Sequence, residues 1–129
     1  MIPEDLIKDL QVLKESGFVC VLVEDGLRIY IVFKNYPLPP LIYNMDKTDL
    51  LIFTTLQYPN VGFDMFWTDE RLTLKNNGVP KNTESIEPYI GKRWRRFSYH
   101  PFNITPWNPS KDSIISYISY IDQRLNKGD

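Results

Sequence analysis

The segment from Trp94 to Trp107, WRRFSYHPFNITPW, contains the only histidine of the chain, His100, two positions after Ser98. The hydroxyl of an isolated serine is hardly ionised at neutral pH, so it becomes an effective nucleophile only beside a base. The imidazole group, with an unperturbed pKa of ~6.5, is suited to that role near pH 7. Residues two apart lie on the same side of an extended chain, so this spacing allows Ser98 and His100 to meet as nucleophile and base.

The same segment also has a structural interpretation. In it, His100 hydrogen-bonds a backbone carbonyl and holds the loop against the final helix, while Ser98 only fills a turn. Aromatic side chains are more often core or anchoring residues than a stacking surface for a ligand. This applies to the four Trp and Phe rings of the segment, Trp94, Phe97, Phe102 and Trp107. The sequence leaves both interpretations open.

Composition limits the classes of protein to which the chain can belong. Its 129 residues are 43% hydrophobic and 14% aromatic, which predicts one domain over residues 1–129 with a core rich in rings. One cysteine, Cys20, excludes an internal disulfide, and one cysteine with one histidine does not make a usual zinc site. We therefore expect no metal and no cofactor. The net charge of −1 gives the whole chain no field that attracts nucleic acid.

The N-terminal stretch MIPEDLIKDL carries acidic residues and no apolar run, so it does not read as a signal peptide. No uncharged stretch reaches the ~20 residues needed to span a bilayer. We expect no membrane association and a cytoplasmic location.

The first half of the chain predicts one helix followed by strands. Leucines at helical spacing after Pro3 predict a helix over residues 3–15. Two apolar runs, FVCVLV and LRIYIVF, flank the turn at residues 24–26 and predict a β-hairpin. A third strand is expected over residues 50–56, and FDMFW and RLTL add one or two short extended pieces. Residues 36–40, YPLPP, are expected to form a loop or an irregular edge.

The second half predicts a long loop and a final helix. Residues 76–92, NNGVPKNTESIEPYIGK, are polar and interrupted by Gly and Pro, which indicates a long surface loop. A helix over residues 111–124, capped by Ser110, follows from one apolar face. That face contains Ile114, Ile118, Ile121 and Leu125, widened by Ile115. The predicted fold is α+β: a helix, a four-stranded antiparallel meander, a long loop and a helix.

This order resembles the ubiquitin-conjugating-enzyme (UBC-like) fold, in which a Tyr-Pro turn follows strand three and a Trp-x-Pro element begins the helix after the active-site loop. The chain is more closely similar to a prokaryotic branch of that family, found beside activating enzymes, isopeptidases and multi-ubiquitin proteins. The matching stretches are YPNVGFDMFWTDERLTL, GKRW, RFSYH and WNPSKDSIISYI, within residues 58–125. The resemblance implies a bacterial ubiquitin-like conjugation pathway.

The resemblance also implies partners. These are a ubiquitin-like protein and a ubiquitin-activating-like enzyme, with an isopeptidase and a target protein as further candidates. Conjugating enzymes usually contact their activating enzyme through the N-terminal helix, where we expect Glu4, Asp5, Lys8 and Asp9 to be exposed.

The chain departs from the family pattern at the nucleophile. Classical members carry a cysteine shortly before the Trp-x-Pro element, whereas here no cysteine follows Cys20, which we expect to be a small buried residue of the first strand. Counting back from Trp107 places Ser98 and His100 near the missing cysteine, although His100-Pro101 also suggests a second register through the classical His-Pro-Asn motif. In the first register Ser98 would accept the ubiquitin-like C-terminus as an oxyester, with His100 as base and Asn103 or a backbone N–H as oxyanion donor.

Two other functions stay open at this point. One is a catalytically inactive adaptor of the same fold, which binds a ubiquitin-like protein without carrying it. The remote alternative is a nucleic-acid-binding domain that uses the cations and ring of Lys92–Arg96. Asp64 is a candidate to deprotonate an acceptor lysine, although a role in a turn is the stronger interpretation.

Overall fold

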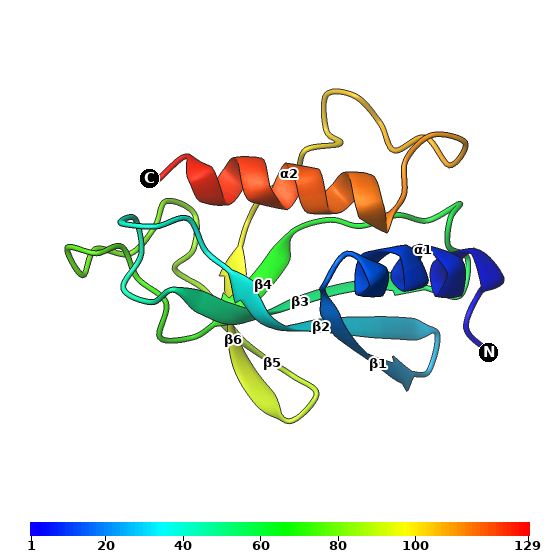
Figure 1. Cartoon of the computed structure of the whole chain (residues 1–129), viewed down its shortest axis with the longest axis horizontal. Coiled ribbons are helices and arrows are strands. Elements are labelled where there is room, and N and C mark those ends of the chain that lie inside the picture. Colours follow the sequence, from blue (N-terminus) through cyan, green and yellow to red (C-terminus); the bar gives the residue numbers. More distant parts are fainter.

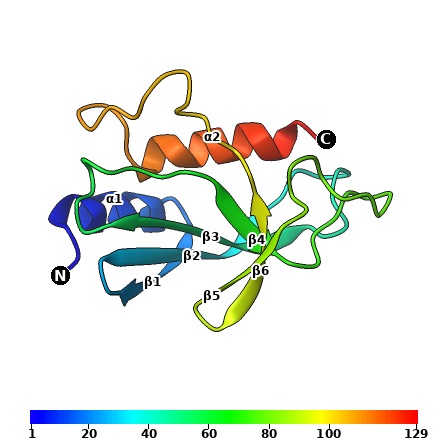
Figure 2. The ribbon, with the colours of Figure 1, turned by 180° about the vertical axis from the view of Figure 1, so that it is seen from behind.

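The computed structural model describes residues 1–129 and contains one antiparallel sheet with two helices on one of its faces (Figures 1 and 2). The sheet has six strands in the order β1-β2-β3-β4-β6-β5. In chain order the elements are α1 (Glu4–Glu15), β1 (Val19–Asp25), β2 (Arg28–Pro37), β3 (Lys47–Thr55), β4 (Phe66–Asp69), β5 (Ile86–Tyr89), β6 (Lys92–Phe97) and α2 (Ile114–Asn126). The α+β class is confirmed.

The main core lies between the sheet and the two helices. Leu6, Leu10 and Leu13 form the buried face of α1, as their spacing predicts. On α2 the inward face adds Tyr117 to the predicted isoleucines and leucine. Ile115 does not widen this face, because 38% of its surface stays exposed. Neither helix has the length and apolar character needed to cross a membrane.

A second, smaller core lies on the opposite face of the sheet. It is built from Tyr30, Val32, Leu51, Trp67 and Trp94. The central strands β2 and β3 are therefore buried on both faces, which explains why their sequences read as nearly continuous apolar runs rather than a strict alternation.

The predicted four-stranded meander is wrong in its strand count. Residues 76–92 are not one long loop, because β5 forms within them and pairs with β6, with Glu87 opposite Trp94. The segment that follows Lys92 is a strand as far as Phe97, although it has no apolar alternation. Its two buried residues face opposite sides of the sheet, Trp94 in the smaller core and Phe97 in the main core, and Arg95 and Arg96 lie between them. The strand β2 also runs on to Pro37, beyond the expected end of the hairpin, through a register shift after Phe33.

The start of α2 also differs from the prediction. The N-cap is Ser113 rather than Ser110, and its side chain accepts the N–H groups of Ile115 and Ser116. The Ser116 side-chain oxygen in turn accepts the Ser113 N–H, which completes a capping box. Ser110 instead donates to Asn108 in the turn before the helix.

Tyr58 connects both helices to the loop after β3. Its hydroxyl donates to Asp9 of α1 at 2.7 Å and accepts the N–H of Ile114 at the start of α2. Asp9 is thus half-buried and engaged, contrary to the expectation of an exposed residue. Nearby, the Trp107 indole donates to the Pro59 carbonyl at 2.7 Å and lies so close to Gly62 that a Cβ there would overlap the ring. These contacts hold the segment between β6 and α2 against the body of the fold.

A candidate nucleophile, base and carboxylate site

The structure brings Ser98, His100 and Asp64 into one hydrogen-bonded line. The Ser98 Oγ lies 3.3 Å from His100 Nε2. On the other side of the ring, His100 Nδ1 lies 2.8 Å from Asp64 Oδ1. Nucleophile, base and orienting carboxylate in this order form the arrangement of a catalytic triad, which is recognised by geometry rather than by chain order.

The carboxylate determines which ring nitrogen faces the serine. Asp64 is an acceptor only, so it favours the neutral tautomer in which His100 Nδ1 carries the hydrogen. The lone pair of Nε2 is then directed at the Ser98 hydroxyl, as a general base requires. The 3.3 Å separation is longer than a tight O–H···N bond and is within the range found for such pairs without bound substrate.

The register of β4 and β6 places the three side chains. Phe66 pairs with Phe97, and just outside this pair the Met65 N–H donates to the Tyr99 carbonyl at 3.0 Å. Asp64, just before β4, therefore lies beside His100, just after β6. The Ser98 backbone is fixed separately, since its N–H donates to the Asn82 carbonyl.

Tyr117 of α2 supports this corner from the core side. Its hydroxyl donates to the Met65 carbonyl at 2.7 Å, next to Asp64. Burial, followed by the nearby charge of Asp64, raises the pKa of Tyr117 far above its ordinary value. The phenol therefore stays a hydrogen-bond donor at any physiological pH and keeps the backbone beside Asp64 in place.

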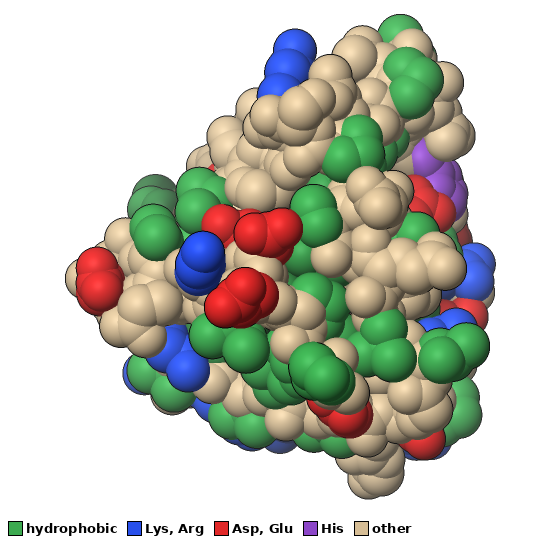
Figure 3. Space-filling view, turned by 90° about the vertical axis from the view of Figure 1, so that its right-hand side faces the viewer, with side chains coloured by type: hydrophobic (Ala, Val, Ile, Leu, Met, Phe, Trp, Pro, Cys, Tyr) green, Lys and Arg blue, Asp and Glu red, His purple; other side chains and the backbone are tan.

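The site is open to solvent. The side chain of His100 is 35% exposed and that of Asp64 is 59% exposed, while Ser98 is half-buried. Figure 3 shows the histidine, in purple, at the molecular surface. A macromolecular acyl donor can therefore approach Ser98 without rearrangement of the core.

Asn103, the expected oxyanion donor, lies one turn beyond the base. Its backbone N–H donates to the His100 carbonyl at 3.2 Å, which closes the turn 100–103. Its exposed side-chain amide and the His100 N–H have no hydrogen-bond partner. The structure thus brings Asn103 near the pair but does not aim its amide at a defined position.

An apolar pocket of about 340 Å³ opens on the Asp64 side of the line. It is lined by the end of β3, the loop 61–65 and Trp107, and Asp64 is its one charged residue. Neither Ser98 nor His100 lines it. The pocket is thus adjacent to the carboxylate rather than to the nucleophile.

Cys20 lies away from this site, on β1. It is half-buried and packs against the main core, and this burial raises the pKa of its thiol. A raised thiol pKa lowers the thiolate fraction on which nucleophilic attack depends. Both observations agree with the structural role expected for Cys20.

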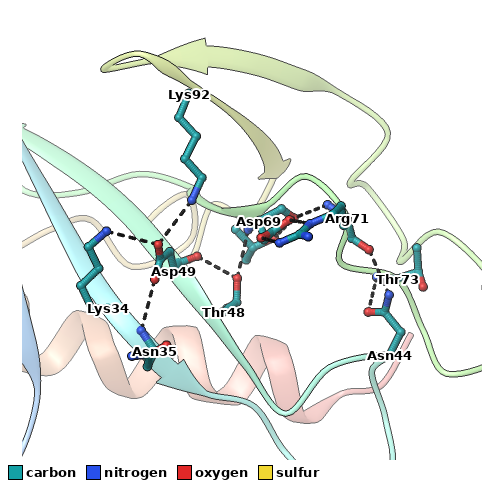
Figure 4. Close-up of polar contacts among 10 residues, drawn as sticks. Lys34, Asn35, Asn44, Thr48, Asp49, Asp69, Arg71, Thr73 and Lys92 are labelled. Carbon is teal, nitrogen blue, oxygen red and sulfur yellow. Dashed lines mark hydrogen bonds and ion pairs between the residues drawn. The ribbon is translucent and has the colours of Figure 1, made fainter.

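The cations of Lys92–Arg96 have partners in the protein, although Lys92 and Arg93 are exposed. Lys92 pairs with Asp49 and Arg96 pairs with Glu87, at 3.3 and 2.8 Å (Figure 4 shows the Lys92 contact). Arg95 donates to two backbone carbonyls, and Trp94 is 1% exposed. With Trp94 buried, this cluster lacks the exposed ring on which bases of single-stranded nucleic acid stack. No group of three His, Cys, Asp or Glu side chains is arranged to hold a metal ion.

The structure is an α+β fold consistent with the UBC-like type, and Ser98 and His100 lie between β6 and α2, ahead of the Trp-x-Pro element. The family model described as prokaryotic E2 family E matches residues 6–128, and the chain belongs to this family. The resemblance found in the sequence is thereby confirmed. Neither the curated proteins nor the solved structures include a match to the chain. The family places the chain in ubiquitin-like conjugation, with a ubiquitin-like protein as partner.

Proposed function

We propose that the protein accepts the activated C-terminus of a ubiquitin-like protein on Ser98 as an oxyester, in place of the thioester of classical conjugating enzymes. The observation that carries this proposal is the hydrogen-bonded line from Asp64 through His100 to Ser98. Two further observations support it. Ser98 and His100 lie in the segment before Trp107, and the one cysteine of the chain is half-buried elsewhere.

The residues divide the transfer step among them. Ser98 Oγ forms the bond to the acyl carbon of a thioester presented by the activating enzyme, and the carbon–sulfur bond breaks. His100 Nε2 takes the serine proton and passes it to the departing thiolate. Asp64 keeps the ring oriented and stabilises its transient positive charge, while Asn103 or the His100 N–H donates to the oxyanion.

A catalytically inactive adaptor is the second candidate, and the Ser98–His100 separation is the observation that favours it. At 3.3 Å the contact is also what a surface hydrogen bond in a structural turn would give. In that case Asp64 and His100 would only fix the loop before α2, and the ubiquitin-like protein would bind without a covalent bond.

Intact-protein mass spectrometry separates the two. The chain is incubated with ATP and with an activating enzyme and a ubiquitin-like protein from a bacterial ubiquitin-like conjugation pathway, and any adduct is then treated with hydroxide or hydroxylamine. Oxyester transfer gives a base-labile adduct that Ser98→Ala removes and Cys20→Ala retains. Binding of the ubiquitin-like protein with no adduct in any variant would establish the adaptor instead.

A further inference from the structure

We propose that the line Ser98–His100–Asp64 also makes the protein a hydrolase of short acyl esters, with water as the final acceptor. The inference uses the same nucleophile as the proposed function but needs neither a ubiquitin-like donor nor an activating enzyme. The two can therefore succeed or fail separately.

The geometry provides the two requirements of ester hydrolysis. The first is a hydroxyl activated by a base that is itself oriented by a carboxylate, which the 3.3 Å and 2.8 Å contacts supply. The second is access of water to the acylated serine. His100 and Asp64 are 35% and 59% exposed, and Ser98 is half-buried, so no chain segment seals this site from solvent.

The hydrolytic cycle balances with water alone. In acylation, Ser98 Oγ bonds to the acyl carbon, the bond to the leaving alcohol or phenol breaks, and the serine proton passes through His100 Nε2 to the leaving oxygen. In deacylation, a water oxygen bonds to the same carbon and the bond to Oγ breaks. The water proton passes through Nε2 back to Ser98, and a carboxylic acid is released.

Water is the acceptor that this site reaches most easily. An incoming amine at neutral pH is almost wholly protonated, because the unperturbed pKa of lysine is ~10.4, and it must lose a proton before it attacks. Water needs only His100 as base, and the neutral ring is regenerated after each acylation. A bound acceptor must therefore compete with hydrolysis at this open site.

The surroundings of Ser98 define the substrate class. The apolar pocket lies beyond Asp64 and is not lined by Ser98 or His100, so no apolar lining holds the start of a chain attached to Oγ. Selectivity for long acyl chains needs such a pocket beside the nucleophile. The expected substrates are therefore esters with a short acyl group and a good leaving group.

The test is steady-state hydrolysis of 4-nitrophenyl acetate by the full chain, followed by release of nitrophenolate. We expect turnover above the buffer rate that falls at least about tenfold in Ser98→Ala and in His100→Gln. Ser16→Ala removes an exposed serine that has no histidine partner and should leave the rate unchanged. Ser98→Cys should retain acylation, as judged by intact mass, because a thiol can use the same base.

Two results would overturn the inference. Full activity in Ser98→Ala would mean that an imidazole or another group reacts with the ester by itself. A single stable acetyl group on Ser98, with no further release of nitrophenolate, would mean that water does not complete the cycle. Circular dichroism of each variant shows whether a loss of rate reflects the site or the fold. Ester hydrolysis with neither a ubiquitin-like adduct nor discharge of the activating enzyme's thioester would support this inference and contradict the proposed function. An adduct without ester hydrolysis would do the reverse.

Discussion

Two polar clusters lie at opposite ends of the paired strands β4 and β6. At one end, Asp64 precedes β4 and contacts His100, which follows β6. At the other end, Asp49 binds Lys34 and Lys92 at 3.3 Å each, and Asp69 at the end of β4 binds Arg71 through both carboxylate oxygens (Figure 4). Each cluster is organised around carboxylates, but the partners of those carboxylates differ.

The partners decide what each cluster can do. Lysine and arginine are permanent cations near pH 7, so the Asp49 and Asp69 contacts fix strands together and offer no group that takes up or releases a proton. Burial acts to raise the pKa of Asp49, but the Asn35 N–H and the two lysines outweigh it and lower the pKa. An imidazole can exchange a proton near neutral pH, and at the other end it contacts a hydroxyl. Only that cluster combines an imidazole with a hydroxyl, the two groups that a base-activated nucleophile needs.

The largest effect that would sharpen this contrast is expected from His100→Gln. Glutamine keeps a hydrogen-bonding side chain but is no base, so the rate of Ser98 acylation should fall by about 10²- to 10⁴-fold. Single-turnover transfer from the charged activating enzyme measures this rate. An unchanged rate would place His100 among the purely structural contacts, together with Lys34 and Lys92.

A smaller loss of rate is expected from Asp64→Asn. The amide no longer stabilises the imidazolium and accepts its N–H less strongly, so acylation should slow by on the order of tenfold. The loss is smaller than for a buried triad carboxylate because Asp64 is 59% exposed and solvent screens its charge. The matched control is Asp49→Asn, which makes the same change at the other cluster and should leave the rate as it is. Equal rates for both variants would remove the distinction between the clusters.

For the free energy of unfolding we expect the opposite order, with a larger effect of Asp49→Asn than of Asp64→Asn. Asp49→Asn leaves Lys34 and Lys92 close together without their shared carboxylate, and it should lower the free energy of unfolding by about 1 kcal/mol. Asp64→Asn changes one exposed contact and should stay within about 0.5 kcal/mol of the parent chain. Urea unfolding at neutral pH measures both. A larger loss for Asp64→Asn than for Asp49→Asn would show that the triad-like line mainly holds the fold.

The sequence predicts the parts of the site that lie close together along the chain. The Ser98-x-His100 spacing predicts a contact that the structure contains, and the leucine spacing of α1 and the apolar runs of β1 to β3 predict their elements. These predictions depend on the local spacing of residues, which can be read from a single sequence. Asp64 was assigned a different role, because its contact with His100 depends on the pairing of β4 with β6.

That pairing was hidden for a physical reason. The strand β6 carries four cations in six residues, and its two buried residues, Trp94 and Phe97, face opposite sides of the sheet, so no apolar alternation marks it as a strand. The charges are tolerated in a strand because partners such as Asp49 and Glu87, distant in sequence, neutralise them. The sequence of β5 predicts part of a loop, because Pro88 and nearby polar residues resemble turn signals, although an edge strand accepts a proline. Local sequence patterns do not show which distant residues pair with a strand, so they do not predict strands such as β6 whose charges are neutralised by such partners.

The smallest expected effect is on the stability of the fold at low pH, and it arises in the cluster of Asp49 and Asp69. The Arg71 side chain, by hydrogen bonding, lowers the pKa of Asp69 from 3.8 to about 2. A carboxyl with a lowered pKa in the folded state stabilises the fold above its unfolded pKa, and this contribution is lost as the pH falls from about 4 towards about 2. Asp69→Asn should therefore flatten the decline in the free energy of unfolding over that range, as measured by urea unfolding at about pH 5, 3 and 2, while ester hydrolysis at neutral pH stays unchanged. An equally steep decline in Asp69→Asn would mean that the acid response arises from other carboxylates, and that the Asp69–Arg71 contact contributes less to the fold than the Asp49 contacts beside it.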